Sequence, residues 1–420
     1  MSVFVKATAS RSRSLKSILG GIAIVGASAL VLSGCAAATD SGKSTSGPRE
    51  PLTLNIGTIL PQSGTLAFLG PPEEAGVALA VKEINAANAG ITVKAEYRDS
   101  GDTTTDTATV SVTDLLSLKV SAIVGAASSA VSKTVIDQIT GAGVIQMSPA
   151  NTSIAFTDYP DNGLYWRTAP SDVLQGEVLG NLIASDGVQN LGIIQLNDSY
   201  GTGLTKKITE IFQAAGGKVV AAPLYNTGDT VFTTQISEVL AAKPDAIALV
   251  TFDEAKIIVP ALKGAGYTGP LYFVDGNLAD YSKDLAAGAL TGDKGTLPGL
   301  DTDKLGDFTK RLLAVDPKLT SFAYAAESYD AVVLLALAAL AANSVDGKAM
   351  AAKLQEVSGG SGDGKKATDF ASAAKIITDG GVVDYDGNSG PITFDKNGDP
   401  QGASIGVYQY AADNTYKRIN

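Results

Sequence analysis

Apolar segments of strand length alternate with segments of helical spacing along most of this chain, and this alternation restricts the possible folds more than any other feature. The series opens with an expected strand from Leu52 and an expected helix from Glu73 to Ala87. It continues with expected strands at 93–98, 122–125 and 144–147 and expected helices at 105–118 and 129–142. Strands that alternate with helices predict a parallel sheet covered by helices on both faces.

A second series of the same kind begins near Ser171. Its expected helices lie at 173–185, 203–215, 232–242 and 255–265, and its expected strands at 190–196, 218–224, 246–251 and 271–275. The two series are similar in length, so the predicted fold class is α/β with two Rossmann-like halves.

The C-terminal third is expected to contain helices at 304–315 and 322–343 and another around 350–357. Two further segments, Pro391–Asp395 and Ser404–Tyr410, flank a turn at Lys396–Asp399 and predict a β-hairpin. The apolar run Ala331–Ala342 has about 12 residues, which is short for a membrane span, so it predicts a buried helix.

The N-terminus predicts export. Basic residues between Lys6 and Lys16 precede an apolar run from Ile18 to Leu32, and the segment then ends in Leu32-Ser33-Gly34-Cys35. This order is typical of a secretory signal that ends in a lipobox. Cys35 is the only cysteine of 420 residues, so it is the expected lipid attachment point. The alternatives are an ordinary signal peptide with an incidental cysteine and an uncleaved anchor.

Composition excludes several classes of function. Without residues 1–34 the chain has 28 basic and 43 acidic residues, a net charge of −15, which argues against nucleic acid as a partner. The chain has no histidine, which removes Ser-His-Asp and Cys-His catalysis and the commonest zinc ligand. No phosphate-binding P-loop is present, so the chain is not expected to be an enzyme, and no cofactor or metal is expected.

One motif imitates a calcium site. Asp384, Asp386, Asn388 and Asp395 have the spacing of an EF-hand loop. The sixth position, which requires glycine, is Ser389, and the twelfth has a short aspartate instead of a glutamate. We therefore expect no calcium there.

Ligands of open α/β sheets bind beyond the carboxyl ends of the strands, which directs attention to the loops after these strands. Ser128 and Ser129 open a helix after the strand at 122–125, where a hydroxyl and free backbone N–H groups suit an anion; the alternative is a plain helix cap. Asp275 ends a strand and suits a cation; its alternative is a cap for a segment starting near Leu278. The loop 148–153, Tyr200 and Phe252 are expected to face the same cleft.

Several short motifs, each weak on its own, occur in a specific order and spacing. They are Gly57–Leu60 with Ser63–Gly64, Glu83–Asn85, Val124–Gly125 with Ser128–Ser129, Ser148–Ala150, Asp198–Gly201 and Gly390–Asp395. In these motifs the chain resembles the leucine/isoleucine/valine-binding protein family, the type I solute-binding proteins of branched-chain amino-acid ABC importers, from about Leu52 to Tyr410. The resemblance implies two α/β lobes joined by three crossovers, with a ligand enclosed when the cleft closes.

The resemblance also implies a binding site for a zwitterion. The carboxylate site falls on Ser129, beside Ser128, and on the backbone of Thr152. The ammonium site falls on the Ala150 carbonyl, the Thr152 hydroxyl and Asp275.

Three further contacts come from the same resemblance. Tyr200 and Phe252 match aromatic positions that close over the ligand, and Phe68 or Leu69 packs against its side chain. The chain departs from the family pattern at Asp275, which is shorter than the usual acidic residue, and at Phe252, which replaces a tyrosine.

The expected organisation is a signal peptide at 1–34, a flexible tether at 35–50, lobe 1 at 51–170 and 301–395, lobe 2 at 171–300 and a C-terminal strand returning to lobe 2 at 396–420. The expected function is that of a monomeric receptor, lipid-anchored at the extracytoplasmic face of the cell membrane. It would bind an amino acid, branched-chain or otherwise aliphatic, and deliver it to the permease subunits of an ABC transporter. The alternatives are a receptor of the same fold for amides, urea or aromatic acids, and a sensory ligand-binding module.

Overall fold

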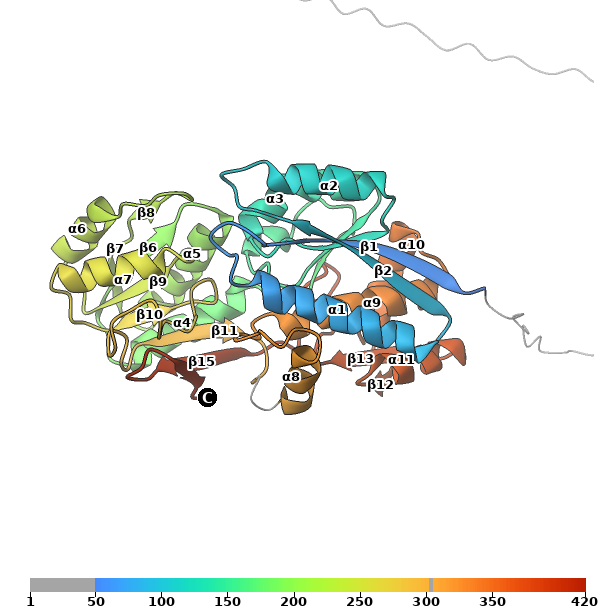
Figure 1. Cartoon of the computed structure of the whole chain (residues 1–420). Coiled ribbons are helices and arrows are strands. Elements are labelled where there is room, and N and C mark those ends of the chain that lie inside the picture. Colours follow the sequence, from blue (N-terminus) through green and yellow to red (C-terminus); the bar gives the residue numbers. More distant parts are fainter. Residues whose placement is uncertain (1–49, 302–304) are drawn as a thin grey trace, which may run out of the picture. The chain divides into compact units, whose positions relative to one another are not determined.

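The structure, a computed structural model, describes residues 50–301 and 305–420 (Figure 1). The predicted signal peptide, Cys35 and all of the predicted tether except Glu50 lie outside the described residues.

The first sheet has five parallel strands in the order β2-β1-β3-β4-β5, and we call the part built on it lobe 1. The strands are β1 (Leu52–Leu60), β2 (Ile91–Asp99), β3 (Ala122–Gly125), β4 (Ile145–Ser148) and β5 (Tyr165–Arg167). Helices cover both faces, as predicted. They are α1 (Gly70–Ala87), α2 (Thr107–Ser117), α3 (Ser129–Gly141), α8 (Gly306–Leu313), α9 (Ala325–Ala342), α10 (Gly347–Val357) and α11 (Phe370–Thr378).

Alternate side chains of β1 enter two separate cores, because successive residues of a strand point to opposite faces. Leu54 and Ile56 pack with α1 and α9, whereas Ile59 packs with α2 and α3. Figure 1 shows α2 and α3 on one side of β1 and β2 and α1 on the other. The sheet is therefore buried on both faces, and its carboxyl edge is left to carry the loops.

Helix α9 is long and apolar enough to cross a membrane by length and composition alone. Its residues from Ala325 to Leu340 are buried inside the protein, where they form the centre of the lobe 1 core. The prediction of a buried helix is confirmed.

The second sheet runs in the order β16-β15-β11-β10-β9-β6-β7, with β8 beside β6, and we call the part built on it lobe 2. The strands are β6 (Asn190–Leu196), β7 (Lys218–Ala221), β8 (Leu224–Tyr225), β9 (Ala246–Val250), β10 (Leu271–Phe273), β11 (Lys294–Pro298), β15 (Ile405–Tyr410) and β16 (Tyr416–Arg418). Its helices are α4 (Asp172–Ser185), α5 (Ser199–Ala214), α6 (Thr233–Ala241) and α7 (Ala255–Gly264). The strands β15 and β16 are antiparallel to their neighbours.

The predicted hairpin is wrong. Strand β14 (Gly390–Pro391) pairs with β13 (Val383–Gly387), which lies beside β12 (Lys365–Ala367). Strand β15 pairs instead with β11 and β16. The predicted turn at Lys396–Asp399 is flanked by a single isolated β-bridge, between Phe394 and Pro400, and not by paired strands. After β14 the chain crosses from lobe 1 to lobe 2, where β15 pairs with strands of the second sheet.

Three chain segments connect the lobes. The first crossover is residues 168–171, between β5 and α4, and the second is residues 299–305, between β11 and α8, of which 302–304 lie outside the description. The third is residues 392–404, between β14 and β15. The first and third crossovers lie wholly within the described residues, and the second lies partly within them, in agreement with the three crossovers that the family resemblance implies.

Candidate ligand-binding site

A cavity with about 260 Å³ of empty space, part of it open to solvent, lies where loops of both lobes meet. Its lining residues are Leu66, Leu69, Ala127, Ser128, Ser129, Ala150, Thr152, Tyr200, Phe252, Asp275, Gly276 and Tyr324. Eight of the nine predicted ligand-binding residues are in this lining. Phe68 is the exception, because it lines a neighbouring groove with Phe322 and Ala323. Of the pair Phe68 or Leu69, the structure places Leu69 in the cavity.

The two serines at the start of α3 have different partners. Ser128 is the N-cap, and its Oγ accepts a hydrogen bond from the Val131 N–H at 3.3 Å. Ser129 Oγ accepts a hydrogen bond from the Ser153 N–H at 3.3 Å. The capping alternative therefore applies to Ser128, and the Ser129 hydroxyl keeps its own proton to donate to a carboxylate in the cavity.

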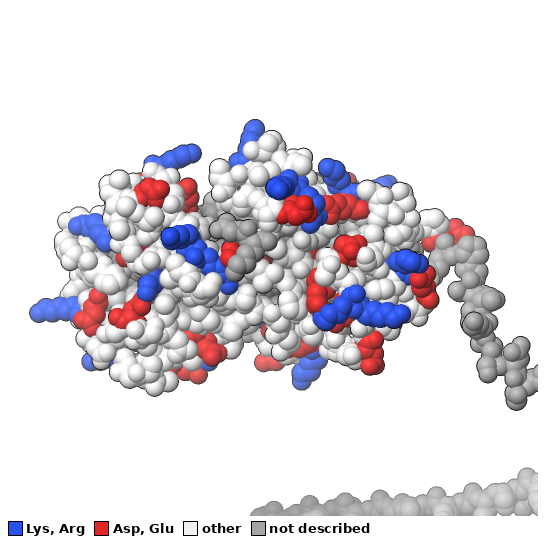
Figure 2. All heavy atoms as spheres, turned by 90° about the horizontal axis from the view of Figure 1, so that it is seen from below, with Lys and Arg blue, Asp and Glu red and all other residues white. Residues whose placement is uncertain are grey.

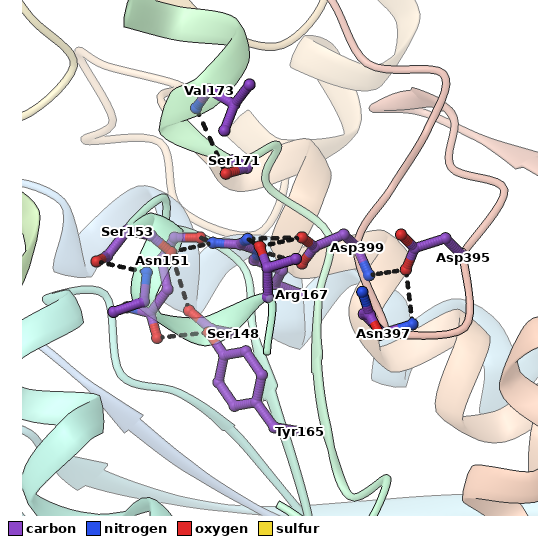
Figure 3. A network of polar contacts seen from close by, with 12 residues as sticks. Ser148, Asn151, Ser153, Tyr165, Arg167, Ser171, Val173, Asp395, Asn397 and Asp399 are labelled. Atoms are coloured by element: carbon purple, nitrogen blue, oxygen red, sulfur yellow. Dashed lines mark hydrogen bonds and ion pairs between the residues drawn. The ribbon is translucent and has the colours of Figure 1, made fainter. Parts of the chain in front are cut away.

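The loop after β4 is held from behind by a buried polar network (Figure 3). The Asn151 side-chain amide donates to the carbonyls of Ala126 and Ala127 at 2.9 and 2.8 Å, and the Tyr165 hydroxyl donates to Asn151 Oδ1 at 3.0 Å. These bonds tie the β4 loop to the β3 loop. The two loops that bring Ser129 and Thr152 to the cavity are therefore fixed relative to each other.

Arg167, at the end of β5, is fully buried beneath the same loop. It forms a bidentate ion pair with Asp399 of the third crossover, in which Nε donates to Oδ1 at 2.6 Å and Nη2 donates to Oδ2 at 2.9 Å (Figure 3). Its Nη1 donates to the Ser153 carbonyl at 2.8 Å. Planar guanidinium and carboxylate groups match in this arrangement, which gives the pair directional strength. The pair joins the end of β5 to the third crossover.

Asp275 lies in lobe 2 and accepts three hydrogen bonds from uncharged donors. Gln175 Nε2 and the Tyr200 hydroxyl donate to Oδ1 at 2.8 and 2.6 Å, and the Tyr324 hydroxyl donates to Oδ2 at 2.7 Å. Burial, with the charge of Asp275, raises the pKa of both tyrosines well above the ordinary value, so both stay protonated donors. A carboxylate has about four acceptor positions, so one remains for a ligand. No helix follows at Leu278, which removes the capping alternative.

An aromatic wall closes the lobe 2 side of the cavity. The rings of Tyr200 and Phe252 are stacked, with centroids 5.3 Å apart and an interplanar angle of 19°. Both side chains are buried. Such a wall suits apolar ligand atoms.

The sequence analysis missed one aromatic and one acidic residue at or near the cavity, Tyr324 and Asp172. Tyr324 precedes α9 in the left-handed backbone region, and Asp172 is the first residue of α4. Asp172 is fully buried, beside Thr152 and Asp275. Burial, reinforced by Asp275, raises its pKa well above the usual range. Its signal in the sequence was an acidic residue directly after the first crossover.

The lobes make direct contact around the cavity. Ser153 Oγ donates to the Ser199 carbonyl at 2.7 Å, and the Asp253 N–H donates to the Thr65 carbonyl at 3.4 Å. Together with the Tyr324 to Asp275 bond, these contacts describe a closed arrangement of the two lobes.

Within residues 50–301 and 305–420, no group of three or more His, Cys, Asp or Glu side chains is placed to hold a metal ion. Asp384 and Asp386 of the EF-hand-like motif pair with Lys366 at 3.1 and 2.5 Å.

Two α/β lobes with a cavity where their loops meet are the architecture of a ligand-binding receptor. The model of a family described as periplasmic binding protein matches residues 53–390, and the chain belongs to this family. The family and its fold are those of substrate-binding receptors that act outside the cytoplasm, and the protein is not an enzyme.

Known proteins resemble the chain over most of its length. The chemotactic signal transduction system substrate-binding protein BasB of Halobacterium salinarum is 25% identical over 355 residues, which cover 82% of this chain and 83% of BasB. The branched-chain amino acid transporter substrate-binding protein LivJ of Streptococcus pneumoniae, solved with isoleucine, matches with a TM-score of 0.71 and 23% identity over 87% of this chain and 99% of LivJ. An ABC transporter solute-binding protein of R. palustris, solved with benzoate, matches with a TM-score of 0.70 and 19% identity over 88% of this chain and 96% of that protein.

Proposed function

We propose that the protein is a lipid-anchored extracytoplasmic receptor that binds a branched-chain or other aliphatic amino acid by cleft closure and delivers it to an ABC importer. The observation that carries the proposal is the cavity between the lobes, which has Ser129 at one side and Asp275 at the other. A buried zwitterion requires a hydrogen-bonded partner for each charge, and this lining supplies both.

The charges around the cavity support an amine ligand. No lysine or arginine is among the lining residues, whereas Asp275 faces the cavity and buried Asp172 lies close enough to interact with it electrostatically. A ligand without an ammonium group would add no positive charge to this pair. A ligand with one would compensate the charge of Asp275, and burial makes this compensation favourable.

The surface of the cavity supports an aliphatic side chain. Leu66, Leu69 and Ala127 line it opposite the stacked rings of Tyr200 and Phe252. An apolar lining of this kind suits an aliphatic side chain.

The molecular surface also favours a small-molecule role over nucleic-acid binding. On the face shown in Figure 2, Lys and Arg side chains lie among Asp and Glu side chains without a large patch of either sign. A nucleic-acid site needs a continuous basic surface.

Calorimetry tests the proposed ligand class. Residues 36–420 contain every described residue, and the described residues form one compact unit. This chain would be unfolded in guanidinium and refolded to remove carried-over ligand, and then titrated with the twenty amino acids, urea, short amides and benzoate. We expect binding of leucine, isoleucine or valine. Binding of amides or aromatic acids alone would refute the amino-acid proposal while leaving a receptor.

The lipid anchor is proposed on the motif Leu32-Ser33-Gly34-Cys35. Labelled palmitate should enter the wild-type chain and not a Cys35→Ser variant. Equal labelling of both chains would refute attachment at Cys35.

A sensory role is the second candidate, and the relative named as a chemotactic signal transduction substrate-binding protein favours it. Deletion of the gene separates the two roles. Loss of uptake of the bound solute supports transport, whereas intact uptake with loss of the behavioural response supports sensing.

A further inference from the structure

Two glutamates are buried away from the ligand cavity, where helices α1 and α9 pack together. Glu73 lies in the first turn of α1 and has no exposed surface, and neither of its carboxyl oxygens has a hydrogen-bond partner among the described residues. Glu327 lies in the first turn of α9 and is 5% exposed. The helices touch closely here, because a Cβ on Gly76 would overlap the Ala325 carbonyl oxygen. Water therefore has little access to either carboxyl group.

Glu327 also lies where the crossovers meet. The Thr168 hydroxyl of the first crossover donates to the Glu327 carbonyl oxygen at 2.9 Å. Gly299 of the second crossover packs against the Glu327 carboxyl group, since a Cβ there would lie 2.7 Å from Oε1. Gly299 is in turn bonded to Ser404 of the third crossover, through its N–H at 2.9 Å and its carbonyl at 3.0 Å. A rotation of the lobes must therefore change the surroundings of Glu327.

Two carboxylic acids and two tyrosines surround the pair. The titratable groups that interact electrostatically with it are Glu74 on α1, Tyr324 and Asp330 at α9 and Tyr408 on β15. Arg418 donates to the Gly299 carbonyl oxygen at 3.2 Å. Burial raises the pKa of Glu327 to about 8, with Asp330 adding to the effect. Burial also raises the pKa of Glu73 well above the usual value, with further contributions from Glu327 and Glu74.

We propose that closure of the lobes takes up a proton from solvent on the Glu73–Glu327 pair, so that alkaline conditions favour the open form. In the closed arrangement Gly299 packs against the Glu327 carboxyl group, and Thr168 is bonded to the Glu327 backbone carbonyl. Opening moves the crossovers and admits water, which stabilises the ionised carboxylate. The inference rests on the proposed cleft closure and not on the identity of the ligand.

The sign of the effect follows from linkage. The closed form binds the proton more tightly, so the closed form loses stability relative to the open form as pH rises. The window runs from the ordinary glutamate value of about 4.5 to the value of about 8 in the closed form. Each unit of difference between the closed-form and open-form pKa changes the ratio of open to closed molecules by about tenfold.

A distance measurement between the lobes tests the proposal without any ligand. Residues 36–420 contain no cysteine, so two introduced cysteines can be spin-labelled selectively. Val110 on α2 and Val231 before α6 are 59% and 71% exposed and belong to different lobes. Dipolar spectroscopy on the V110C/V231C chain would give the open and closed populations from pH 6 to pH 9.

The expected result is a rise of at least about tenfold in the open-to-closed ratio between pH 6 and pH 9. Glu327→Gln and Glu73→Gln should each reduce this response, and Glu177→Gln, at an exposed residue of α4, should not. A distance distribution of the wild-type fold that stays constant over this range would overturn the proposal, as would an unchanged response in Glu327→Gln. Neither outcome depends on which solute binds, so failure here is distinct from failure of the proposed amino-acid site.

Discussion

Replacement of Asp275 by asparagine tests the ammonium site most directly. Asparagine keeps the size of the side chain and removes its charge. Its amide group must also face one of the three present donors, Gln175, Tyr200 or Tyr324, so a donor would oppose a donor. Both effects act on the position that an ammonium group would contact.

The magnitude follows from the lost interaction. A hydrogen bond between charged groups contributes about 1.5 to 3 kcal/mol. This corresponds to a rise in Kd of about tenfold to 150-fold. Asp280→Asn provides a matched control, because it makes the same chemical change at an exposed residue five positions along the chain.

The assay is calorimetric titration of both variants with leucine and with 4-methylpentanoate, which lacks the amine. Wild-type protein should prefer leucine, and Asp275→Asn should lose most of that preference, while Asp280→Asn keeps it. Such a comparison isolates the interaction of the carboxylate with the amine. If a folded Asp275→Asn protein discriminates between the two solutes as well as wild type does, the reasoning is refuted.

Other predictions concern the supports of the site. Ser129→Ala should raise the Kd for an amino acid by about tenfold or more in calorimetry, because the carboxylate loses a hydroxyl donor. Ser128→Ala should leave the affinity nearly unchanged. It should lower the free energy of unfolding by about 0.5 to 2 kcal/mol, because Ser128 caps α3. Arg167→Met leaves Asp399 buried without its cation and should cost about 3 to 5 kcal/mol in urea unfolding; a loss below 1 kcal/mol would contradict this reading. Gly201→Ala places a Cβ against the preceding strand and should cost about 1 to 3 kcal/mol, with an unchanged unfolding midpoint as the contrary result.

Local patterns predicted most elements but not every boundary. The helix expected from Gly203 begins at Ser199, because the Asp198 side chain accepts the Gly201 N–H at 2.7 Å and caps the helix one turn earlier. Gly201 is inside the helix and packs against the carbonyl of Leu196. The local cap at Asp198 therefore sets the start of the helix, whereas the close approach of helix and strand, a tertiary feature, requires glycine at position 201.

Long-range pairing was beyond the sequence pattern. Strand β15 pairs with β11, more than a hundred residues earlier, so the local turn at Lys396–Asp399 gave no information about its partner. The same limit applies to Tyr324, which reaches Asp275 only because the second crossover returns the chain to lobe 1. Strand ends, in contrast, bring Ser129, Thr152 and Asp275 to the cavity, and these were accessible from the order of the elements.

The contacts between Ser153 and Ser199 and between Asp253 and Thr65 join protein groups only. These contacts hold the two lobes together around the cavity, so a ligand bound between the lobes is released when they separate. Its residence time is therefore limited by how often the protein itself opens. Excess competing solute in the medium would not shorten that time, and ligands of different affinity share the same upper limit on their rate of escape.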